Sequence, residues 1–131
     1  MLAELEGDGR LVLADMEAGL GTLFRMQPGQ IDVVVVVAEP SAKGIDVARR
    51  AARIGANRAR VIVVANRVSE QADLDVIRNA LGEYELVSVP EEPVIERADR
   101  EGLAPIDLDP DAPGVQALAG MAELIAEGTS R

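Results

Sequence analysis

Four short apolar runs follow one another along the chain, and segments of helical periodicity lie between and after them. The runs are residues 11–14, 33–38, 61–65 and 86–89. The two middle runs are continuous and rich in valine, a pattern typical of parallel strands that are buried on both faces. We therefore predict four strands, with the two middle ones at the centre of the sheet.

The segments between the runs predict helices. Residues 41–54 form the first, which Gly55 would end as a C′ residue. Asp73 would cap the second, which ends at Gly82. A short third helix covers residues 93–101 and closes at Gly102, and residues 105–114 read as a loop. A final helix carries an apolar stripe at helical spacing: Val115, Leu118, Ala122 and Ile125.

This alternation predicts a single α/β domain over residues 1–131, a three-layer sandwich around a short, mainly parallel sheet of about four strands. Ligands of such sheets bind beyond the carboxyl ends of the strands. The chain places its most distinctive polar residues and prolines there: Asp15, Glu39, Pro40, Asn66, Arg67, Pro90 and Glu91.

The amino-acid composition argues against several classes of function. The formal net charge of −10 argues against nucleic acid as a partner, because phosphate contacts need a basic surface. The chain has no cysteine and no histidine, so a metal site would need carboxylates and water, with Mg²⁺ as the natural ion. The longest apolar run is far too short to cross a membrane. We expect a cytoplasmic protein.

Asp15 directly follows the first apolar run, and Gly19 comes four residues later. An acidic residue at a strand end followed by a glycine turn suits a nucleotide-dependent magnesium site, in which Asp15 holds the water shell of the ion and Glu17 to Gly19 form a switch. A strand-end aspartate that only caps the next turn would give the same pattern.

Two later strand ends carry further candidates for nucleotide binding. The amide of Asn66, followed by Arg67, can donate and accept hydrogen bonds at the edge of a base. Pro90 and Glu91 could pack against that base. Both motifs also have purely structural explanations. Asn66 could be a turn asparagine, and residues 90–93 could be a strand–helix connector whose acidic residues interact favourably with the helix dipole.

Taken in order, these strand-end motifs resemble the MinD/ParA-like deviant P-loop ATPases. Among them the chain is most similar to the CooC type, the accessory ATPases of nickel insertion into carbon monoxide dehydrogenase. The stretches that carry the resemblance are Asp15-Met16-Glu17-Ala18-Gly19-Leu20 and residues 32–53, and the likeness extends over about residues 11–125.

The resemblance implies a role for each candidate. Asp15 would be the Walker B residue that organises Mg²⁺ and the attacking water, and Glu17 to Gly19 the switch II turn. Asn66 would contact adenine, with Arg67 beside it, and Pro90 and Glu91 would lie over the base. ATP or ADP with Mg²⁺ would be the cofactors, bound weakly or only together with a partner.

The chain also departs from these ATPases. It contains no G-x-x-x-x-G-K-[ST] loop, and phosphoryl transfer depends on the charge stabilisation which that loop supplies. We therefore expect no ATP hydrolysis by this chain alone. The paired-cysteine metal site of the CooC type is excluded too. The P-loop strand lies in the family between the strands that match residues 11–14 and 33–38, so these two would pair directly or leave edges for a partner.

Three functions stay open. The first is a P-loop-lacking relative or half of such an ATPase, with an accessory role in metalloenzyme maturation and with a P-loop-bearing chain or a second copy as partner. The second is a non-catalytic interaction module that keeps only the fold. The third is a hydrolase or transferase that uses Asp15 and Glu17 as an acid–base pair.

Overall fold

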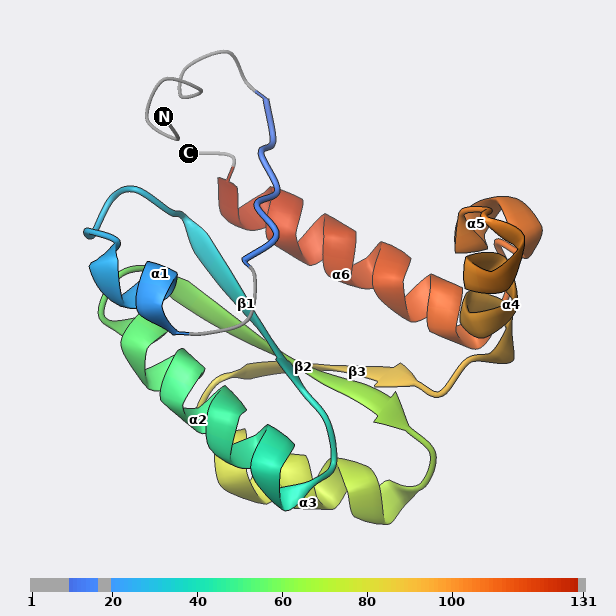
Figure 1. Ribbon diagram of the computed structural model, residues 1–131, viewed down its shortest axis with the longest axis horizontal. Coiled ribbons are helices and arrows are strands. Elements are labelled where there is room, and N and C mark those ends of the chain that lie inside the picture. Colours follow the sequence, from blue (N-terminus) through green and yellow to red (C-terminus); the bar gives the residue numbers. More distant parts are fainter. Residues whose placement is uncertain (1–9, 17–19, 130–131) are drawn as a thin grey trace.

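A computed structural model describes residues 10–16 and 20–129 of the chain (Figure 1). Its helices and strands follow one another as α1 (Gly21–Arg25), β1 (Val33–Ala38), α2 (Ala42–Ala56), β2 (Arg60–Val68), α3 (Gln71–Leu81), β3 (Glu85–Pro90), α4 (Pro93–Glu101), α5 (Pro105–Leu108) and α6 (Pro113–Thr129).

The three strands form one parallel sheet in the order β1-β2-β3. Two right-handed crossovers that step in the same direction put their helices on the same face of a sheet. Accordingly, α2 and α3 pack together below the sheet with α1 against α2, and α6 crosses the opposite face (Figure 1). The predicted three-layer α/β architecture is confirmed.

β2 is the central strand, and its residues 61–65 are all buried. Alternate side chains of this run point to the two faces of the sheet, so a continuous apolar run suits a strand that is covered on both sides. On the α2–α3 face the core joins Val63 and Ala65 to Ile45, Ile77 and Leu81. The prediction that residues 61–65 are buried on both faces is confirmed.

The prediction of a fourth strand at residues 11–14 is wrong. In the structure this segment lies outside the sheet and makes no strand pairing, and 84% of the Leu13 side chain is exposed. Leu11 and Val12 are exposed as well. An apolar run identifies a segment that can be buried, but a strand also needs a neighbour with which to share its backbone hydrogen bonds.

The prediction that residues 33–38 are buried on both faces is also wrong. β1 is an edge strand in which Val36 and Ala38 face the core but Val37 is 58% exposed. The reason is the path of α6, which packs mainly over β3 and touches β1 only lightly. Five successive valines therefore form an edge whose outer face is incompletely covered.

Two predicted helix ends differ from the observed ones. Gly55 lies inside α2, where an added Cβ would come 3.2 Å from the side chains of Val34 and Val61, so this glycine allows the helix to approach the sheet closely. Asp73 is the third residue of α3 rather than its cap. Glu70 holds the cap position, and the two side chains form a reciprocal capping box.

The last third of the chain agrees better with the prediction. α4 has the predicted bounds, with Pro93 in its first turn and Gly102 in the left-handed conformation at its end (φ 67°). The predicted loop at residues 105–114 contains the one-turn helix α5 and the start of α6. Among the helices that the structure describes, none has the length and apolar character needed to cross a membrane.

Candidate functional site

The carboxyl ends of β2 and β3 meet at one edge of the sheet. Val68 pairs with Pro90 in the parallel register, and the Glu91 amide donates a hydrogen bond to the Val68 carbonyl at 3.0 Å. These contacts bring the segment that contains Asn66 and Arg67 next to Pro90 and Glu91. Two of the motifs that the sequence singles out are therefore neighbours in space.

The end of β2 is irregular at the predicted site. The register of β2 against β3 shifts between Ala65 and Val68, which marks a β-bulge. Within it Arg67 has a φ of 56°, the only positive φ of a non-glycine residue that the structure describes. Such a conformation costs about 1–3 kcal/mol and is found preferentially at binding and switch sites. The bulge thus places strain at the expected position of a ligand.

Arg67 is also the link between two strand ends. Its guanidinium Nη1 lies 4.0 Å from the Glu39 carboxylate, which directly follows β1. Both side chains are largely exposed, so the pair stabilises the fold little. Its importance lies in position, since Arg67 is the cation at an edge that otherwise carries carboxylates.

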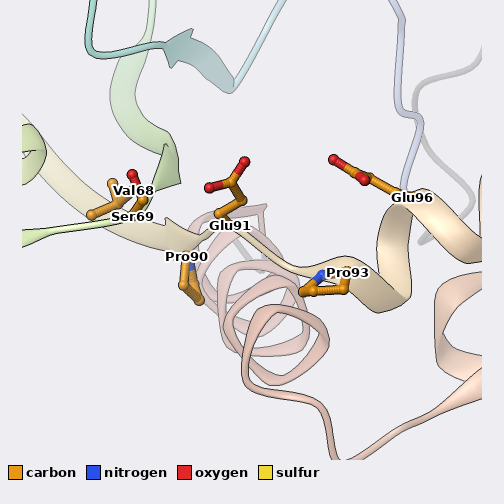
Figure 2. A pocket seen from close by; sticks show the side chains of 6 residues that line it. All are labelled: Val68, Ser69, Pro90, Glu91, Pro93 and Glu96. Carbon is orange, nitrogen blue, oxygen red and sulfur yellow. The ribbon is translucent and has the colours of Figure 1, made fainter.

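An open hollow of about 400 Å³ lies beside this edge (Figure 2). Six residues line it, from β2, β3 and the first turn of α4: Val68, Ser69, Pro90, Glu91, Pro93 and Glu96. The Glu91 and Glu96 carboxylates reach toward each other over its open side (Figure 2). Pro90 and Glu91 are thus predicted site residues that line a real depression in the surface.

The lining determines what the hollow can hold. The rings of Pro90 and Pro93 offer rigid apolar surface, which suits the face of a flat heterocycle. Glu91 and Glu96 make the same hollow acidic, which repels phosphate groups. The hollow therefore offers apolar surface, but its two carboxylates disfavour a phosphate chain.

Asn66 lies close to the hollow without lining it. It comes two residues before Val68, and it is partly buried. Within the part of the chain that the structure describes, its side-chain amide makes no hydrogen bond. Its donors and acceptor are therefore not used within the described part of the chain.

Ser69 is less available to a ligand because its amide and hydroxyl already donate hydrogen bonds to Asp73. The Asp73 carboxylate accepts hydrogen bonds from the Ser69 amide at 3.0 Å, the Ser69 hydroxyl at 2.8 Å and the Glu70 amide at 3.3 Å. The hydrogen bonds from Ser69 are the main reason why the pKa of Asp73 lies below its usual value. This network fixes the turn that leads from the hollow into α3.

The structure does not bring Asp15 into this site. Asp15 is exposed, follows the segment that lies outside the sheet, and does not line the hollow. The other two members of the proposed switch, Glu17 and Gly19, lie outside the described residues. Within residues 10–16 and 20–129 no group of three acidic side chains is arranged to hold a metal ion.

Sequence reasoning missed Val68, Ser69 and Glu96 as parts of the lining. β2 continues three residues beyond its apolar run, which moves the strand end from Ala65 to Val68. Glu96 stands one helical turn after Pro93 and so shares the hollow with it. The i,i+3 spacing from Pro93 was the available signal for Glu96, whereas the extension of β2 depends on pairing with β3.

Comparisons with known proteins place these features in a wider context. The carbon monoxide dehydrogenase accessory protein CooC of Rhodospirillum rubrum is 28% identical over 102 residues, which are 76% of this chain and 39% of that protein. The MinD cell division protein of Aquifex aeolicus aligns with a TM-score of 0.52 and 23% identity, over 78% of this chain and 46% of that structure. No protein-family model matches the chain.

Both relatives are more than twice as long as the part that this chain matches. The likeness to MinD shows the fold, which is a parallel sheet flanked by helices. Together with the weak sequence match to CooC, it supports a relationship to the MinD/ParA-like group of P-loop proteins.

Proposed function

We propose that this chain is a P-loop-lacking relative or half of a CooC/MinD-like ATPase that keeps the base-side part of the nucleotide site. The observation that carries this proposal is made at the carboxyl ends of two adjacent parallel strands, where Val68, two residues after Asn66, pairs with Pro90 and accepts a hydrogen bond from the Glu91 amide. The match to CooC supports the same reading.

We assign a different role to each residue of the proposed site. The Asn66 amide reads the edge of adenine, Pro90 and Glu91 pack beside the base, and Arg67 supplies a positive charge at the bulge. Asp15 would hold the water shell of Mg²⁺, with Glu17 and Gly19 in the switch. Since Asp15 stands outside the sheet, its part depends on a partner that completes the site.

ATP or ADP with Mg²⁺ is the proposed ligand, bound weakly or only beside a partner. The acidic hollow offers no favourable surface to a triphosphate, so most of the affinity must come from the base. Because the chain has no G-x-x-x-x-G-K-[ST] loop to stabilise the charge of the transferred phosphoryl group, it does not hydrolyse ATP alone. The role we propose is accessory and cytoplasmic, in the maturation of a metalloenzyme.

A non-catalytic interaction module is the second candidate, and one observation favours it. β1 is an edge strand of five successive valines without lysine or proline, and no strand among the described residues pairs with its outer side. Most proteins avoid such an edge because it can pair with a strand of another chain. In the first proposal this edge would receive a P-loop-bearing chain. In the second it would serve association alone.

Calorimetric titration with ATP and with ADP, each with and without Mg²⁺, separates these functions. We expect both nucleotides to bind, with similar affinity because the base dominates, and Asn66→Ala to weaken binding by about tenfold or more. Asn79→Ala is the matched control, since Asn79 is exposed on α3 away from the site. If neither nucleotide binds at millimolar concentration, the proposal that this chain alone recognises the base is refuted.

A further inference from the structure

Charge is distributed very unevenly along this acidic chain. Six of its 13 basic residues lie between positions 43 and 60, with one acidic residue among them. Ten of its 23 acidic residues lie between positions 83 and 111, with two arginines among them. The first segment forms α2 and the start of β2, and the second forms β3, α4 and α5.

The positive charges gather on the solvent side of α2. We call this surface the basic face and define it as Lys43, Val47, Arg49, Arg50 and Arg53. Arg50 pairs with Asp46, but Lys43, Arg49 and Arg53 have no ion pair within the described residues. Val47 lies one helical turn from Lys43 and from Arg50 and is 48% exposed. The basic face also includes Asp46, so it carries four basic residues and one acidic residue, with Val47 as an exposed apolar side chain beside them.

The α4–α5 region presents the opposite arrangement. We call this surface the acidic end and define it as Asp99, Leu103, Ile106, Asp107 and Asp111. Leu103 and Ile106 are exposed large apolar side chains, the latter by 58%. The carboxylates of Asp99, Asp107 and Asp111 have no ion pair within the part of the chain that the structure describes. The acidic end therefore combines exposed apolar side chains with an excess of negative charge.

The two surfaces cannot meet within one molecule. Figure 1 shows α2 below the sheet on the left and the α4–α5 pair at the right-hand end of the molecule. They are complementary in charge, and each carries exposed apolar side chains that a contact would bury. A symmetric dimer through either surface alone would set like charges against each other.

We propose that the basic face of one copy docks on the acidic end of a second copy, head to tail. The net charge of −10 opposes association at long range, but at physiological salt the Debye length is about 8 Å and the charges in contact dominate. A heterologous contact of this kind closes into a ring or grows into a chain. This association needs no nucleotide and does not depend on the function proposed above.

Sedimentation velocity over a range of protein concentrations tests the proposal. We expect species larger than a monomer at about 0.15 M salt and their dissociation at about 1 M, where the Debye length is about 3 Å. Lys43→Glu/Arg53→Glu removes the basic face and Asp107→Lys/Asp111→Lys removes the acidic end. Each double variant alone should be monomeric, with association weakened by at least about tenfold.

A mixture of the two variants gives the decisive result. Each variant keeps the surface that the other has lost, and the two reversed surfaces are also opposite in charge, so a 1:1 mixture should associate although neither variant does so alone. Arg25→Glu/Arg78→Glu makes the same change in net charge as the basic-face variant, but outside both surfaces, and should associate like the wild type. A monomeric wild type at both salts, an association that the variants leave unchanged, or a mixture that stays monomeric would overturn the proposal. All the substituted side chains are exposed, and circular dichroism checks that the variants fold.

Discussion

At the scale of single residues, Glu92 and Gly114 show how one contact joins distant parts of the chain. One carboxylate oxygen of Glu92 accepts a hydrogen bond from the Val94 amide at 3.2 Å and caps α4. The other accepts from the Gly114 amide at 2.9 Å, at the start of α6. A Cβ on residue 114 would overlap the Glu92 side chain. Glycine is therefore needed for close approach here, and not for an unusual backbone conformation.

We predict that Gly114→Ala lowers the free energy of unfolding by about 1–3 kcal/mol, because the added methyl group forces Glu92 away and strains the packing. Gly120→Ala is the matched control in the same helix, where an added Cβ meets nothing within 4 Å. It should raise stability by about 0.5–1 kcal/mol, the usual gain of alanine over glycine in a helix. Urea denaturation measures both, and equal effects would refute this account of Gly114.

At the scale of elements, one arginine connects α1 to the rest of the fold, in addition to the buried side chains of Leu23 and Met26. A helix of five residues has no stability of its own. The Arg58 guanidinium donates hydrogen bonds to the carbonyls of Phe24, Met26 and Ile54 at 2.8–2.9 Å, and it lies 5.7 Å from the centre of the Phe24 ring. Arg58 thus ties α1 and the following residues to the end of α2.

We predict that Arg58→Met detaches α1 without unfolding the domain. Methionine keeps the apolar stem but loses all three charged hydrogen bonds, each of which contributes about 1.5–3 kcal/mol. Amide hydrogen exchange should accelerate by at least about tenfold in residues 23–27 and stay unchanged in α3. Arg49→Met, on the exposed side of α2, is the control and should change neither segment. Uniform acceleration over the whole chain would show that Arg58 supports the global fold instead.

At the scale of the whole molecule, two carboxylates link neighbouring elements and make stability depend on pH. Arg60 at the start of β2 donates two hydrogen bonds of 2.6 Å to Glu85 at the start of β3, and these lower the pKa of Glu85. Asp73 similarly joins the end of β2 to α3, and its pKa is lowered by Ser69. Both groups bind a proton less readily in the folded chain than in the unfolded one.

The sign of the effect follows from this difference. A folded-state pKa below the unfolded value, about 4 for these groups, stabilises the fold above pH 4, and this contribution disappears as pH falls through the folded pKa. We predict that Glu85→Gln and Asp73→Asn lower stability at pH 7 but flatten its decline between about pH 5 and pH 2. Thermal unfolding across that range checks the prediction.

Glu83→Gln is the control for both variants, because Glu83 makes no hydrogen bond or ion pair among the described residues. It removes the same charge next to the same strand. If it flattened the acid decline as much as Glu85→Gln does, the effect would come from net charge and not from the hydrogen-bonded pair.

The sequence by itself determined the layers of this protein. The valine-rich run at 61–65 predicted the central strand, because continuous apolar side chains are typical of a parallel strand that is covered on both faces. Pro93 and Gly102 predicted both ends of α4, because each restricts or requires a particular backbone conformation locally. The candidates Asn66, Pro90 and Glu91 were also found in this way, as residues at strand ends.

Only the tertiary structure decided which apolar segments join the sheet and what the strand ends enclose. Two of the apolar runs are buried less than predicted: residues 11–14 lie outside the sheet, and residues 33–38 form an edge strand that is partly exposed. The burial of a run depends on which other elements pack against it. The bulge at Arg67 and the hollow between β2, β3 and α4 exist because Val68 pairs with Pro90. Such pairing joins residues far apart in the chain, and a local pattern carries no information about it.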